Sequence, residues 1–124
     1  MKYQRKIKKE ILCPLEHGLE IFGGKWKSRI ICVLFSQDVL RYGELRKELS
    51  TITDAVLAAM LKELIADGLI NRISYNEIPP KVEYSLTERG KSVIPILQSI
   101  CLWSQKQTSD ELEKKLPPCK TCSY

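Results

Sequence analysis

The sequence predicts an α+β fold that is mainly α-helical, with one two-stranded β-ribbon placed before the last helix. Apolar residues recur at helical spacing through most of the chain, which indicates amphipathic helices. Two short segments that alternate apolar and polar residues flank Pro79-Pro80, a pattern typical of a hairpin. The 124 residues suit a single domain, so these elements must share one core.

The chain divides into a basic arm at 1–12, a folded domain at 13–104 and a polar tail at 105–124. Hydrophobic residues make up 44% and charged residues 28%, as in an average soluble protein. Its longest apolar run, 30–35, is far shorter than the roughly 18 residues of a membrane span, so we expect a cytoplasmic protein. A net charge of +5 favours an anionic partner. The basic arm either lies along the phosphates of this partner or only improves the solubility of the protein.

The domain is expected to begin with two helices. Pro14 suits a first helical turn, and an apolar face containing Leu15 and Leu19 extends to Gly23-Gly24, where the first helix ends. The second runs from about Lys25 to Phe35 and carries a broad apolar surface. Basic residues at its start oppose the helix dipole unless an anion lies nearby.

A helix-turn-helix is predicted next. The segment 40–42 is too short for an independent strand but can pair as an edge, and 42–49 follows as a short helix. After a turn at 50–52, Thr51 or Thr53 can cap a helix that ends at Gly68. Its apolar residues lie at helical spacing, and two helices joined by so short a turn form a candidate helix-turn-helix.

The ribbon consists of predicted strands at 69–75 and 81–86, joined by the proline-containing loop 76–80. The last helix should run from Thr87 or Glu88 through Trp103, kinked at Pro95. Its apolar stripe is wider than one small core needs, which predicts a homodimer. The predicted interface residues are Val93, Ile94, Leu97, Ile100, Cys101 and Trp103.

These elements in this order make a winged helix-turn-helix, and several of its segments resemble the HxlR-type transcriptional regulators. The most specific segment is Pro79-Pro80-Lys81-Val82-Glu83-Tyr84-Ser85-Leu86-Thr87. In order before it come Cys13-Pro14, Gly23-Gly24-Lys25-Trp26, Gly43-Glu44-Leu45-Arg46, Leu61-Lys62-Glu63-Leu64 and Asp67-Gly68-Leu69-Ile70. The resemblance covers 13–103 and implies a MarR-like homodimer that binds double-stranded DNA.

In a helix-turn-helix the first turns of the recognition helix meet base edges, while outward lysines reach phosphates. The predicted DNA-binding residues are Arg41, Thr51, Thr53, Asp54, Ala55, Ala58, Lys62 and Lys81. Asp54 and the alanines depart from the family, whose members more often carry polar or basic side chains there. Asp54 either caps its own helix or accepts a hydrogen bond from a cytosine amino group.

Cys13 is the candidate redox-sensing residue. A thiol at a helix start feels the positive end of the helix dipole, which favours the thiolate, and the resemblance implies a sensor of oxidants or electrophiles at this position. The alternative is a buried cysteine that acts as a small apolar residue. Cys32 and Cys101 are expected to be unreactive.

We expect no metal, no cofactor and no enzymatic activity. Cys119-x-x-Cys122 has the spacing of half a zinc site, which Cys13 and His17 could complete, but zinc sites usually pair two such knuckles. One histidine, no glycine-rich phosphate loop and no triad spacing leave only a thiol reaction as candidate chemistry, so a thiol-redox enzyme is a third, weaker hypothesis. The leading hypothesis is a sequence-specific transcriptional regulator acting as a repressor, and the alternative is a winged-helix protein-interaction module that has lost DNA binding. The sequence does not indicate a small-molecule effector.

Overall fold

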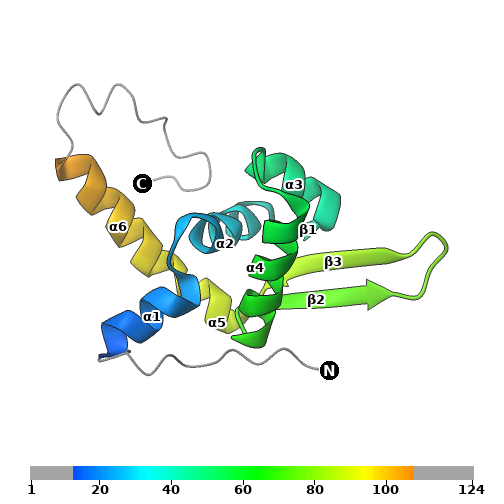
Figure 1. Ribbon diagram of the computed structural model, residues 1–124, viewed down its shortest axis with the longest axis horizontal. Helices are drawn as coiled ribbons and strands as arrows, with labels where there is room; N and C mark the ends of the chain where they lie inside the picture. The colour runs from blue at the N-terminus through cyan, green and yellow to red at the C-terminus, as the bar shows by residue number, and fades with distance from the viewer. Residues whose placement is uncertain (1–12, 108–124) are drawn as a thin grey trace.

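A computed structural model describes residues 13–107, which form a mainly helical fold with one antiparallel sheet (Figure 1). The predicted basic arm, the predicted half zinc site and residues 108–124 of the predicted polar tail lie outside these residues, whereas residues 105–107 of that predicted tail belong to the last helix. The elements in chain order are α1 (Pro14–Phe22), α2 (Lys25–Gln37), β1 (Val39–Arg41), α3 (Tyr42–Leu49), α4 (Asp54–Ala66), β2 (Ile70–Tyr75), β3 (Lys81–Leu86), α5 (Glu88–Lys91) and α6 (Ile94–Gln107).

Local signals in the sequence set most of these boundaries. Pro14 occupies the first turn of α1, where a missing N–H costs no helical hydrogen bond. Gly24 precedes α2 with a φ of 82°, in the left-handed region that favours glycine. Of the two threonines proposed as the cap of α4, Thr53 is the one that caps: its hydroxyl accepts a hydrogen bond from the Val56 N–H at 3.2 Å.

The sheet has three strands in the order β1-β3-β2, one more than the predicted ribbon. Leu40 lies opposite Tyr84 of β3, so the segment after α2 does pair as an edge strand. Because β1 reaches only from Val39 to Arg41, the outer part of the β2–β3 hairpin has no third strand beside it. That outer part projects from the domain as the wing (Figure 1).

Every major element contributes apolar side chains to a single core. Leu57, Leu61 and Leu64 point inward from α4, as the spacing predicted, and pack with residues of α2 and α3. The most deeply buried side chains are Ile30, Ile31, Leu34, Leu45, Leu49, Leu57, Leu64 and Leu69. The core therefore holds α4 by one face and leaves the opposite face in solvent.

The structure confirms a long C-terminal helix, α6, but the prediction that it is continuous from Thr87 or Glu88 and kinked at Pro95 is wrong. Residues 92 and 93 form a turn that separates α5 from α6, and Pro95 is the second residue of α6. Proline fits the first turn of a helix but not its interior, because it has no N–H to donate to the carbonyl four residues earlier and its ring clashes there, so the helix breaks before α6 and Pro95 lies in the first turn of α6. α6 then continues to Gln107, beyond the predicted end at Trp103.

The molecule is elongated, with different elements at its two ends. α1 and α6 lie at one end of the long axis and the wing at the other, with α3 and α4 between them (Figure 1). Within residues 13–107, no helix has both the length and the apolar character that crossing a membrane requires.

Candidate nucleic-acid interface

The helix-turn-helix consists of α3, the turn at 50–53 and α4. The outer face of α4 is exposed and carries small side chains with one lysine at the end of the row: Ala55, Ala58, Ala59 and Lys62. These residues, with Glu63, line a shallow surface depression. A helix with one buried and one exposed face, presented by a short turn, is the arrangement with which a recognition helix enters a major groove.

The turn before α4 carries two exposed threonines among the predicted contacts. Thr51 is exposed, and its backbone N–H donates to the Leu49 carbonyl at 2.7 Å. Thr53 uses a hydroxyl lone pair for the cap of α4, which leaves its hydroxyl hydrogen available to an outside acceptor. Arg41 is exposed at the start of α3, where its backbone N–H donates to the Glu44 carboxylate at 2.9 Å.

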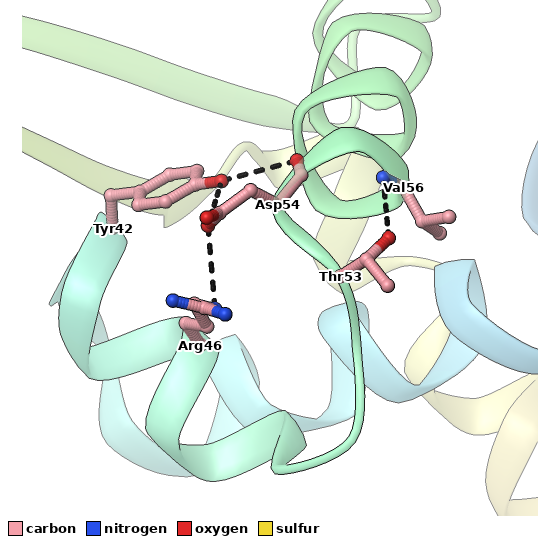
Figure 2. A network of polar contacts seen from close by, with 5 residues as sticks. All are labelled: Tyr42, Arg46, Thr53, Asp54 and Val56. Carbon is pink, nitrogen blue, oxygen red and sulfur yellow. Dashed lines mark hydrogen bonds and ion pairs between the residues drawn. The ribbon is translucent and has the colours of Figure 1, made fainter.

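Asp54 is joined to α3 by a polar network (Figure 2). The Tyr42 hydroxyl donates to Asp54 Oδ1 at 3.1 Å, and Arg46 Nε lies 3.3 Å from the same oxygen. Desolvation raises the pKa of Tyr42, and the hydrogen bond to Asp54 and the charge of that carboxylate raise it further, so the hydroxyl remains a protonated donor. Sequence reasoning missed Tyr42 and Arg46. Their i, i+4 spacing on α3 is the signal that could have found them.

On the wing, Lys81 begins β3 opposite Tyr75 of β2. Its ammonium lies 4.8 Å from the centre of the Tyr75 ring and 3.9 Å from the Glu83 carboxylate. A hydrogen bond with Glu83 raises the pKa of Tyr75. These contacts hold the Lys81 ammonium beside the outer part of the hairpin, while Lys62 extends into solvent from α4.

The predicted dimer residues fall into two groups. Val93, Ile94 and Leu97 are buried in the core of the chain itself, because the break before α6 turns them inward. Ile100 and Trp103 keep 52% and 65% of their surface exposed, and Cys101 is half-buried.

Four further apolar side chains are exposed on the two helices at this end of the molecule. They are Ile96 and Leu102 on α6 and Leu15 and Leu19 on α1. The sequence pattern had assigned Leu15 and Leu19 only to an apolar helix face, without indicating whether that face is covered. We call Leu15, Leu19, Ile96, Ile100 and Trp103 the apolar end face.

Cys13 precedes α1 and is exposed, at the same end of the molecule as the apolar end face. The alternative of a buried, apolar Cys13 is therefore wrong, whereas Cys32 and Cys101 are half-buried. His17 is exposed one turn further along, and its backbone N–H donates to the Cys13 carbonyl at 3.3 Å. Within the part of the chain that the structure describes, no three His, Cys, Asp or Glu side chains come close enough to hold a metal ion.

Comparisons with known proteins agree with this architecture. The chain is 41% identical over 109 residues to an uncharacterized HTH-type transcriptional regulator of Halalkalibacterium halodurans, covering 88% of this chain and 96% of the relative. An HTH-type transcriptional regulator of Methanothermobacter thermautotrophicus is 46% identical over 102 residues, which cover 82% of this chain and 77% of the relative.

Two solved structures of named regulators are similar to this chain over most of its length. The redox regulator HypR in its oxidized form superposes with a TM-score of 0.71 and 38% identity, covering 78% of this chain and 99% of HypR. The reduced transcriptional regulator YodB from Bacillus subtilis has a TM-score of 0.71 and 30% identity, covering 80% of this chain and 97% of YodB. Residues 21–112 match a family described as HxlR-like helix-turn-helix. Most of the chain lies within that match, and its relatives in Halalkalibacterium halodurans and Methanothermobacter thermautotrophicus are HTH-type transcriptional regulators; the chain therefore belongs to the HxlR-like helix-turn-helix family.

Proposed function

We propose that this protein is a homodimeric, sequence-specific DNA-binding transcriptional regulator that acts as a repressor. The observation that carries the proposal is the exposed outer face of α4. The inner face of this helix is buried in the core, and the helix lies beside the wing that carries Lys81. HTH-type transcriptional regulators among the relatives support the same function. We prefer repression to activation, because a dimer bound to a promoter blocks access to that DNA without any additional protein.

DNA contacts are divided between the two parts of this surface. The first turns of α4 enter the major groove, and Lys62 and Arg41 reach phosphates on either side. Lys81 contacts phosphate or the minor groove from the wing. Ala55 and Ala58 offer only methyl groups, which can touch a thymine methyl but cannot form the bidentate hydrogen bonds that discriminate most strongly between bases. Phosphate contacts and DNA shape therefore supply a large part of the affinity.

The dimer forms through the apolar end face together with Cys101. These side chains are too exposed for a monomer that leaves them in water, and they lie away from the wing. Pairing two copies through this end leaves both copies of α4 free. A two-fold axis would then set the recognition helices about 34 Å apart, one turn of DNA.

Cys13 is the proposed sensor of oxidants or electrophiles. Its thiol is exposed, whereas Cys32 and Cys101 are half-buried. Relatives in solved structures include the redox regulator HypR and a diamide-treated form of YodB, which supports redox sensing for this chain. Modification of Cys13 would change the surface next to Leu15 and so weaken the dimer that DNA binding needs.

The test is retardation of random duplex DNA by the purified full chain at low salt, followed by selection of preferred sites from the same pool. We expect retardation at micromolar protein or below and enrichment of a two-fold symmetric site. The exposed alanines of α4 favour one rival function, a winged-helix protein-interaction module. Failure to retard any duplex at low salt, by a folded dimer, would support that rival and overturn the proposal.

A further inference from the structure

We infer that Asp54 selects a cytosine in each half of the DNA site: its carboxylate accepts a hydrogen bond from the cytosine 4-amino group, and Tyr42 and Arg46 are positioning residues that hold it for this contact. The inference rests on the proposed DNA-binding function. It goes further by naming the base that one position of the recognition helix reads.

The place of Asp54 in the helix makes its carboxylate available. It is the first residue of α4, in the turn that a recognition helix presents to base edges. Its side chain is 64% exposed. Thr53 supplies the cap of α4, so the Asp54 carboxylate is not used for that purpose. On the exposed part of α4 that follows, Ala55, Ala58 and Ala59 carry no hydrogen-bonding side chain.

The network in Figure 2 fixes the orientation of the carboxylate. The Tyr42 hydroxyl lies 3.1 Å from Oδ1 and 3.2 Å from the Asp54 backbone carbonyl, and Arg46 Nε lies 3.3 Å from Oδ1. Both side-chain contacts use Oδ1, so Oδ2 is the oxygen best placed to accept from a partner outside the chain. A side chain held this way loses less conformational entropy on binding than a free one.

Charge decides whether a carboxylate can approach DNA at all. An isolated acid would be repelled by the phosphates, but the Arg46 guanidinium at 3.3 Å offsets the charge of Asp54. The positive end of the α4 dipole offsets it further. The pair therefore approaches the groove with little net charge, and the acceptor character of the carboxylate remains.

The base follows from the edges that the major groove displays. Cytosine presents an amino donor there, whereas guanine presents acceptors at N7 and O6 and thymine presents an acceptor at O4, and these acceptors repel a carboxylate. Adenine has an amino donor but places the N7 acceptor beside it. Cytosine is therefore the base that suits this position.

The experiment uses the full chain and the site selected from random duplexes. Wild-type protein is measured on the selected duplex and on one in which the conserved cytosine is replaced by 2-pyrimidinone, which lacks only the 4-amino group. We expect wild type to lose about tenfold in affinity, the value of one hydrogen bond to a charged group. Asp54→Asn, in contrast, should lose less from the same base replacement, about two- to fivefold, because its amide offers only a neutral acceptor.

Two further variants separate positioning from a general structural effect. Tyr42→Phe keeps the ring and removes the hydroxyl that fixes Oδ1, so we expect it to reduce the preference for cytosine while retaining affinity for random DNA. Glu48→Gln removes one negative charge, as Asp54→Asn does, but from an exposed position of α3. It should leave the preference for cytosine unchanged.

Equal losses for wild type and Asp54→Asn on the modified duplex, or selection of sites without a conserved cytosine, would overturn the inference and leave the proposed function standing. Failure of wild type to bind any duplex would instead overturn the proposed function. Equal affinity of wild type for the two duplexes would also overturn the inference, so the inference can be refuted even if Asp54→Asn folds poorly.

Discussion

Lys27 of α2 and Glu63 of α4 form an ion pair, with Nζ and Oε2 separated by 3.3 Å. The same ammonium donates to the Glu20 carbonyl at 3.1 Å, so one side chain joins α1, α2 and α4. Lys27 is 6% exposed. A buried cation is tolerated when it is paired and hydrogen-bonded, and this pair supplies the anion that the basic start of α2 needs.

The first prediction concerns this pair. We expect Lys27→Ala to lower the free energy of unfolding by about 2–4 kcal/mol, because it removes one partner of a buried pair. The midpoint of urea unfolding should fall with an unchanged slope. Lys25→Ala is the matched control: its ammonium lies 4.6 Å from the centre of the Trp26 ring in an exposed position. We expect the control to cost less than about 1 kcal/mol. Equal losses in the two variants would contradict a special role for the pair.

The second prediction concerns phosphate contacts by the wing. Each such contact releases counterions, so Lys81→Ala should weaken binding to all duplexes alike and reduce the slope of log affinity against log salt by about one. Lys91→Ala on α5 removes an equal charge away from the wing and should change the slope much less. A slope unchanged by Lys81→Ala would show that the wing lysine does not contact phosphate.

A third prediction uses the small side chains of α4. Ala55 is exposed in the first turn of this helix. Ala55→Arg should raise affinity for all DNA by adding a phosphate-binding charge, and it should change the preferred sequence, because arginine pairs with guanine in the major groove. Repeating the site selection with this variant measures both effects. A gain in affinity with the wild-type sequence preference retained would show that position 55 does not face base edges.

The fourth prediction is that the apolar end face joins two copies of the chain. Sedimentation of wild type at micromolar concentration should give twice the monomer mass, and Ile100→Asp should shift it to the monomer because it buries a charge in the interface. The same change at Ile78, which is fully exposed at the end of the hairpin, is the control and should leave a dimer. A monomeric wild type would remove the two-half-site geometry.

The fifth prediction concerns the reactivity of Cys13. Because its thiol is exposed and precedes a helix, an electrophile at neutral pH should modify it faster than half-buried Cys32 and Cys101. Peptide-resolved mass spectrometry after short labelling times measures the three rates. Labelled wild type should bind DNA more weakly, and Cys13→Ser should resist that loss. Cys13 labelling no faster than the other two would contradict the proposed sensor.

Sequence patterns alone determined the helices as far as α4, the hairpin and the inward face of α4. These features depend on local spacing: apolar residues every three or four positions indicate a helix, and Pro79-Pro80 between alternating segments indicates a hairpin loop. The core leucines of α4 followed directly from that spacing. The edge pairing of β1 was also foreseen, because a short β-prone segment can be stabilised only by a neighbouring strand.

Tertiary structure decided which apolar faces are covered and which charges meet. Periodicity marks a face as apolar but does not reveal what packs on it. In the structure Leu15 is exposed, whereas Val93 and Ile94 are buried in the core because the chain breaks before α6. Lys27 and Glu63 meet only because α2 and α4 pack together in this fold. Arg46 reaches Asp54 because the turn between α3 and α4 brings the end of one helix to the start of the next. Such contacts depend on how helices cross, which local spacing does not encode.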